Sequence, residues 1–345
     1  MTALSINSPV LTRDDRLDFV RVLSCFAVVL LHVSARPIYM QGELGAWGWL
    51  LGNAVSSLTH WCVPVFVMLS AALILGNVKT TYRVMLRSRI PRMLGVLAVS
   101  ALVYALWMKF FQAGFIWDAF LRSLVLGQPY YHLHFFYLII GLYFIAPALS
   151  RAVVDMPEIE LRNVVIVTCL LTMVVFAWSS FSRTYTPNGA TFSWWYISYY
   201  LLGYYLHRYQ PELPYAWILA GGYLVTVAGT QILAYTMGST YIWKLYFYSY
   251  FSPTVFAMAI GVWGMAIKYS HLISARFLRV AAPLTLLVYI LHPMVMEFLR
   301  AQYTKVSPSL MQPIVEVPMT VVLTFSVSLA AAWLLRKIKI VNKYF

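Results

Sequence analysis

Two ionisable residues, Arg21 and His32, stand inside the first long apolar run of the chain, residues 17–39. They are eleven positions apart, which places both side chains on one face of a helix, about 16 Å apart along its axis. A lipid-facing arginine can extend to the membrane surface, and a neutral histidine can simply bond to a neighbouring helix. Ionisable residues inside a membrane nevertheless tend to mark functional sites, where histidine transfers protons and arginine binds anions. We therefore expect a functional site on this face.

Further histidines occur in other apolar runs. His132 and His134 open the fourth run, and His292 lies in the middle of the ninth. We expect several of these side chains to share one polar cavity near the outer half of the membrane, whereas His60, in the second run, is expected to be structural. A metal site is disfavoured, because carboxylates are scarce there and residues two positions apart project from different helix faces.

The densest basic segment is KTTYRVMLRSRIPRM, residues 79–93. Basic residues in such a loop anchor the chain on the cytoplasmic side of a membrane. Arg89 and Arg92 lie on adjoining faces at the mouth of the third apolar run, so their guanidinium groups could also clasp one phosphate group together. A cytosolic anion would then have a route from this basic entrance to Arg21.

These residues must be positioned by membrane-spanning helices, because 61% of the 345 residues are hydrophobic and only 10% are charged. A span needs about 20 apolar residues. The apolar runs are 17–39, 47–76, 93–111, 132–150, 163–181, 192–207, 215–237, 246–267, 281–302 and 314–335. We predict an all-α polytopic membrane protein with about ten transmembrane helices. Residues 1–345 would form one membrane domain, including an N-terminal segment at 1–16 and a C-terminal tail at 336–345.

The distribution of basic residues predicts the topology. Of the 25 Lys and Arg residues, 17 fall in the first and alternate later connections, 7 fall in the others and Arg21 lies within a span. Because basic residues concentrate in cytoplasmic loops, we predict that both termini are cytoplasmic. The net charge of +14 is thus attributed to topology and not to nucleic-acid binding.

The motifs, taken in order, resemble those of the acyltransferase-3 family, membrane proteins that O-acetylate bacterial surface polysaccharides. RLDFVRVLSCFAVVLLH at 16–32 is similar to the family's opening motif, VPVFVMLSAAL at 63–73 to its second span, and RIPR at 89–92 to its two-arginine motif. HLHFFYLIIGLYFIAPAL, FSWWYISYYLLGYYL and LTLLVYILHPMVME are similar to later spans. Ala71 and His134 depart from the usual glycine and tryptophan, which leaves the subgroup and the acceptor open.

The resemblance implies an acetyl-CoA donor as co-substrate, no permanently bound cofactor, and a sugar hydroxyl as acceptor. The donor phosphates would dock on Arg89 and Arg92, with Arg83 or Arg87 assisting. Arg21 would guide the pantetheine arm inward.

We assign catalytic or supporting roles in the transfer from this donor to the remaining polar residues. His32 would act as general base or, alternatively, as an acetyl-carrying nucleophile. Asp18 would pair with Arg21 at a spacing of three. The candidates for orienting the acceptor or stabilising an oxyanion are His132, Tyr289 and His292. Glu297 is either a second base or merely solvated, and Ser70 is expected to pack or hydrogen-bond.

Three alternatives remain. A transporter or flippase of a lipid-linked sugar would use the same polar residues to line a pathway. A second membrane acyltransferase architecture is disfavoured, because the key histidine here lies in the first span. A scaffold would have no use for costly intramembrane charges. The expected setting is a bacterial inner membrane, with a glycan or polyprenyl-linked sugar as acceptor; a homodimer is left open.

Overall fold

The computed structural model describes residues 13–39, 41–77, 79–112, 114–182, 192–236, 245–306 and 312–344. All regular elements within these ranges are helices: α1 (Asp15–Tyr39), α2 (Gln41–Ser57), α3 (Cys62–Ile74), α4 (Tyr82–Val84), η1 (Met85–Arg89), α5 (Ile90–Phe111), α6 (Trp117–Val125), α7 (His134–Val154), α8 (Glu158–Phe181), α9 (Phe192–Trp195), α10 (Ile197–Tyr209), α11 (Tyr215–Thr236), η2 (Tyr246–Tyr248), α13 (Pro253–Tyr269), η3 (Ser270–Leu272), α14 (Ala275–Ala281), η4 (Ala282–Leu284), α15 (Thr285–Val306), α16 (Pro313–Leu335) and α17 (Lys339–Tyr344). In the described ranges, nine helical stretches are long and apolar enough to cross a membrane. The predicted all-α polytopic fold is confirmed.

Several of these membrane-spanning stretches consist of more than one helical element. The second joins α2 and α3 across a non-helical break at residues 58–61. The third runs without interruption through α4, η1 and α5, a total of 30 residues. At 1.5 Å per residue it is about 45 Å long and exceeds the hydrocarbon core of about 30 Å. The basic residues on its first turns favour placing those turns outside the hydrocarbon core.

The run at 192–207 differs from the predicted span. It forms α9 and the 13-residue α10, which is too short to cross alone. Every residue from 198 to 206 is buried, and Gly203 lies against the backbone of Met68 in α3. This helix is thus enclosed by protein, and it returns the chain from the end of α8 to the start of α11.

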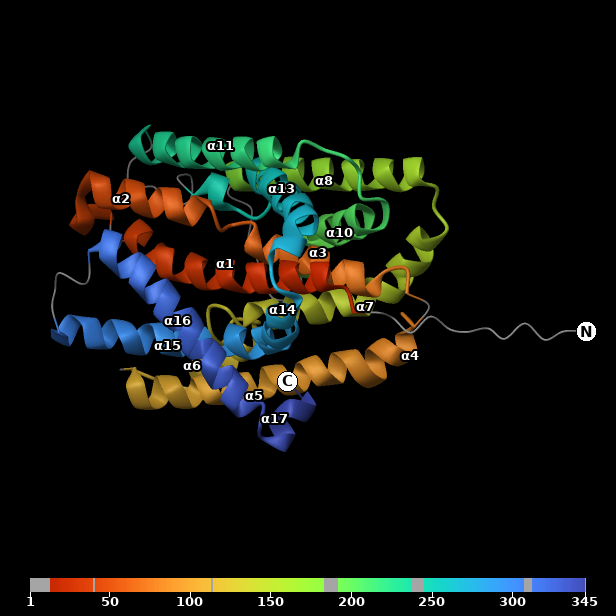
Figure 1. The fold of residues 1–345 in the computed structure, drawn as a ribbon. Helices are drawn as coiled ribbons and strands as arrows, with labels where there is room; N and C mark the ends of the chain where they lie inside the picture. Colours follow the sequence, from red (N-terminus) through yellow and green to blue (C-terminus); the bar gives the residue numbers. More distant parts are fainter. Residues whose placement is uncertain are drawn as a thin grey trace, which may run out of the picture.

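The first helix lies in the middle of the bundle, between α2 and α3 on one side and α15 and α5 on the other (Figure 1). Its most apolar stretch is 67% buried, compared with 17% for α11 and 22% for α8 at the edge of the bundle. Because α1 contacts α2, α3, α13, α14, α15 and α16, polar residues on it face protein and not lipid.

The last long helix, α16, runs antiparallel to α1. Arg36, near the end of α1, lies 3.6 Å from Glu316, near the start of α16, and Phe26 packs on Phe325 farther along both helices. Beyond these contacts α16 diverges from α1 and crosses α15, and α17 contacts α5, so that the start of α1 and the end of the chain both lie toward the same end of the bundle (Figure 1). The same end carries the basic segment, which is the basis for predicting that it faces the cytoplasm.

Candidate active site

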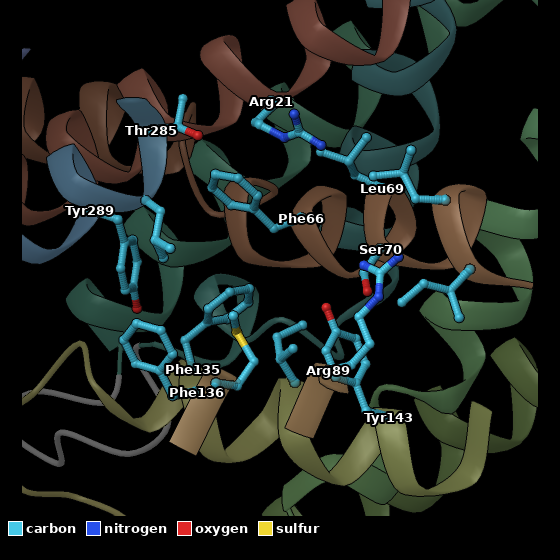
Figure 2. A pocket seen from close by; sticks show the side chains of 15 residues that line it. Arg21, Phe66, Leu69, Ser70, Arg89, Phe135, Phe136, Tyr143, Thr285 and Tyr289 are labelled. Atoms are coloured by element: carbon cyan, nitrogen blue, oxygen red, sulfur yellow. The ribbon is translucent and has the colours of Figure 1, made fainter. Parts of the chain in front are cut away.

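A cavity of about 210 Å³ lies among α1, α3, α5, α7 and α15. Its lining consists of Arg21, Phe66, Leu69, Ser70, Leu73, Ile74, Arg89, Met93, Phe135, Phe136, Ile139, Tyr143, Thr285, Leu286 and Tyr289. Figure 2 shows Arg89, Ser70 and Tyr143 gathered at one end and Tyr289 at the opposite end. The cavity is therefore polar and cationic at one end and mainly apolar along its length.

The cationic end is built on α1. Arg21 lines the cavity instead of extending toward lipid, and its guanidinium lies 3.1 Å from a carboxylate oxygen of Asp18. Asp18 is buried and also pairs with Arg13. Since a buried charge requires a counter-charge, this shared carboxylate holds Arg21 in place about two turns from the start of the helix.

The second cation comes from the helix that precedes α5. Arg89 is the last residue of η1, a π-helical turn, and such turns often occur at functional sites. Tyr143 lies within electrostatic reach of Arg89, Arg21 and Arg92, but of these arginines only Arg21 and Arg89 line the cavity, and Arg92 is exposed beside it. Arg83 and Arg87 do not line it; both are exposed on the projecting turns.

Three histidines form one cluster beyond the opposite end. The rings of His32 and His292 stack, with centroids 5.2 Å apart, and the centroids of His132 and His292 are 5.5 Å apart. Tyr289, which lines the cavity, lies 5.3 Å from His132 between ring centroids and 5.9 Å from His292. His32 does not line the cavity, so the connection from Arg21 runs through Tyr289 and not directly along α1.

A proline fixes the orientation of His292. Pro293 has no N–H to donate to the carbonyl of Tyr289, four residues earlier, and that carbonyl instead lies 2.7 Å from Nδ1 of His292. Nδ1 therefore carries the hydrogen, which leaves Nε2 as an acceptor. Nε2 is buried without a hydrogen-bond partner. His292 thus presents an unused lone pair to the cluster.

The ring of His132 is held differently. The hydroxyl of Tyr289 donates to the backbone carbonyl of His132, while both ring nitrogens are buried without a hydrogen-bond partner. The centroid of the ring lies 5.5 Å from that of His292 and 4.9 Å from that of Tyr104, and burial in such surroundings disfavours the charged form of an imidazole. The ring is therefore neutral and can donate one hydrogen bond. Because buried polar groups are nearly always paired, these nitrogens are suited to a bound substrate.

A carboxylate network next to the cluster was not fully predicted. Glu297 accepts hydrogen bonds from Tyr130 and, at 2.9 Å, from the indole of Trp107. Tyr130 in turn packs against His132. Glu297 is therefore held by protein and not merely solvated. Its position, five residues after His292 near a helix end, gave no indication of which partners it meets.

The sequence also missed an ion-pair group near His32. Arg300 donates to Glu316 at 2.7 Å and to the carbonyl of Val33 at 2.8 Å, and it lies within electrostatic reach of His32. Glu316 also pairs with Arg36. These residues come from three different helix ends, so sequence spacing could not reveal their association.

His60 and Ser70 are two further polar residues of the apolar runs. His60 stacks on Tyr248 at 4.3 Å, and its Nδ1 lies 2.7 Å from the carbonyl of Ser56, which fits a structural role. Ser70 lines the cavity beside Arg89. Among the residues that the structure describes, no group of three His, Cys, Asp or Glu side chains is arranged to hold a metal ion.

The fold and the cavity define a polytopic membrane protein in which a cationic entrance leads to a buried histidine cluster, an arrangement suited to group transfer. The family model of the acyltransferase-3 proteins, described as an acyltransferase domain, matches residues 14–336. The chain belongs to this family and is a membrane acyltransferase. Comparisons with curated proteins and with solved structures gave no match.

Proposed function

We propose that the enzyme transfers an acetyl group from cytosolic acetyl-CoA to a hydroxyl of a cell-surface polysaccharide, or of its lipid-linked precursor, in a bacterial inner membrane. The observation that carries this proposal is the cavity, which begins at Arg21 and Arg89 and ends at Tyr289 beside the histidines. Guanidinium groups bind phosphate oxygens in pairs, and an apolar passage suits the narrow pantetheine arm.

In this account the donor phosphates bind at the projecting start of the third span. Arg89 and Arg92 contact them, and Arg83 and Arg87 add attraction from outside the cavity because they are exposed on the same turns. The pantetheine arm passes Arg21 and brings the thioester to Tyr289. The acyl carbon then lies at the wall formed by His132 and His292.

The transfer step requires one base and one oxyanion donor. His32 takes the proton of the acceptor hydroxyl as the oxygen attacks the thioester carbonyl. Neutral His132 donates a hydrogen bond to the oxyanion that forms. The carbon–sulfur bond then breaks, and the leaving thiolate takes the proton from His32. Positioned proton transfer of this kind contributes about 10²–10⁴-fold in rate.

A covalent route uses the same residues. A nitrogen of His32 would bond to the acyl carbon, coenzyme A would leave as the thiol with the histidine proton, and the acceptor hydroxyl would then displace the histidine and return a proton to it. Acid quenching during turnover distinguishes the routes, because only this one leaves label from [acetyl-¹⁴C]acetyl-CoA on the protein.

The competing function is transport of a lipid-linked sugar, in which the cavity would be part of a pathway. The test uses membranes from a strain that lacks the protein, with and without the wild-type gene restored, supplied with acetyl-labelled acetyl-CoA. We expect alkali-labile label in the surface glycan only when the protein is present. Movement of lipid-linked sugar without such label would favour the transporter.

A further inference from the structure

A second cavity, of about 340 Å³, lies under α6 at the far end of α5 from Arg89. Its lining residues come from the end of α5, the segment that enters α6, one face of α6 and the turn that follows. They are Met108, Gln112, Gly114, Phe115, Ile116, Ala119, Phe120, Ser123, Gln128 and Pro129. The volume lies within the range of about 300–1,000 Å³ that is typical of small-molecule sites.

The lining of this cavity is polar without being charged. Gln128 supplies an amide donor and acceptor, whereas the N–H groups of Gln112 and the hydroxyl hydrogen of Ser123 are engaged within the protein, so these two residues offer acceptor oxygens. Phe115 and Phe120, with ring centroids 6.0 Å apart, add an apolar surface. No arginine, lysine or carboxylate is among the lining residues, so a phosphate or carboxylate ligand would find no counter-charge. The lining suits a neutral ligand rich in hydroxyl groups.

Hydrogen bonds to Tyr130 and Glu297, followed by ring contacts, connect this cavity to the histidine cluster. The side-chain amide of Gln112 donates to the hydroxyl of Tyr130 at 3.1 Å and to Glu297 at 3.3 Å. The ring of Tyr130 packs on Tyr131 at 4.8 Å, and Tyr131 contacts His32 at 5.0 Å. The two cavities therefore approach the same histidines from opposite ends of the bundle.

We propose that the cavity under α6 binds a neutral saccharide unit of the acceptor. The acceptor chain then reaches His32 from the end opposite to coenzyme A, and Gln112 and Tyr130 align it. This inference rests on the proposed acetyl transfer and adds the entry side and the uncharged chemistry of the acceptor.

The test fills the cavity without altering the histidine cluster. Ala119→Trp places an indole in the lining, whereas Leu121→Trp, on the same helix at a position that is 52% exposed and outside the lining, adds the same side chain elsewhere. Each variant is expressed in the strain that lacks the protein. The readouts are ester-linked acetyl groups per repeat of the surface glycan and the Kd of the purified variant for coenzyme A.

We expect Ala119→Trp to reduce glycan acetylation at least tenfold while the Kd for coenzyme A stays within twofold of wild type and Leu121→Trp acetylates normally. Normal acetylation by Ala119→Trp overturns the inference, as does an equal loss in both variants, which would assign α6 a role in lipid contact alone. If Ala119→Trp does not accumulate in the membrane, Gln128→Ala at the exposed rim takes its place. We expect Gln128→Ala to reduce glycan acetylation at least threefold, and an unchanged level of acetylation would contradict the inference. Absence of acetyl transfer by the wild type would instead reject the proposed function.

Discussion

Nδ1 of His292 lies 2.7 Å from the backbone carbonyl of Tyr289, the carbonyl that Pro293 leaves without its helical donor. This contact places the hydrogen of the imidazole on Nδ1 and leaves Nε2 as a free acceptor, next to the stacked ring of His32. The cluster therefore contains one ring whose tautomer is set by the backbone. Two histidines, not one, are arranged for proton transfer.

His292→Gln removes the basic nitrogen while retaining a side chain of similar length, because an amide can accept a hydrogen bond but cannot take up a proton. We expect kcat to fall at least 100-fold, the low end of the usual contribution of a positioned base, with the Kd for coenzyme A unchanged. Steady-state transfer and equilibrium binding measure the two quantities. His271→Gln, on an exposed turn, is the matched control and should behave as wild type. Full activity of His292→Gln would show that the Nε2 lone pair is not used.

Pro293→Ala tests the origin of the tautomer. The alanine N–H can donate to the Tyr289 carbonyl and compete with the imidazole, so we expect kcat to fall about tenfold even though the helix itself becomes more regular. Pro318→Ala in α16 is the control for removing a helix-interior proline. Thermal unfolding should show that neither variant is less stable. An unchanged kcat for Pro293→Ala would show that the contact between His292 and the Tyr289 carbonyl does not determine the activity.

Arg89→Ala should weaken binding of coenzyme A by about 10–100-fold, because a charge-assisted hydrogen bond contributes about 1.5–3 kcal/mol. The loss should shrink as the salt concentration rises. Arg83→Ala removes an equal charge from the same helix at a position that does not line the cavity and should cost less than threefold. Calorimetric titration measures both. Equal losses would mean that the basic segment acts only through its total charge.

Asp18→Asn should destabilise the protein by about 3 kcal/mol, since it removes the buried counter-charge of Arg21. Asp14→Asn breaks the more exposed pair with Arg16 and should cost about 1 kcal/mol or less. Unfolding in detergent with both variants gives the comparison. If the two variants were equally stable, Asp18 would not be the residue that holds Arg21 in the membrane.

The sequence predicted much of this arrangement, because hydropathy and basic residues determine which segments cross a membrane. Arg21 and His32 were recognisable because charge and imidazole stand out in an apolar run. The sequence did not predict that α10 is short and enclosed, since an apolar run has the same composition whether it faces lipid or protein. The His292-Pro293 pair carried a signal, a freed carbonyl beside an imidazole, that was readable in principle.

Other parts of the site depend on contacts that local patterns do not encode. Glu297 meets Tyr130 and Trp107, and Arg300 meets Glu316, across long sequence separations. The second cavity depends on how α6 folds back on the end of α5, which composition alone does not determine. The sequence therefore identified the ionisable residues that stand alone in apolar runs. It did not identify the residues whose role depends on contacts with distant parts of the chain.

The central claim is that His32 belongs to the reacting centre. Purified protein receives acetyl-labelled acetyl-CoA and surface glycan extracted from the strain that lacks the enzyme, and the ester-linked label is measured for wild type and His32→Ala. We predict that the substitution lowers transfer at least 100-fold while the Kd for coenzyme A stays within twofold. Transfer at the wild-type rate by His32→Ala would contradict the account.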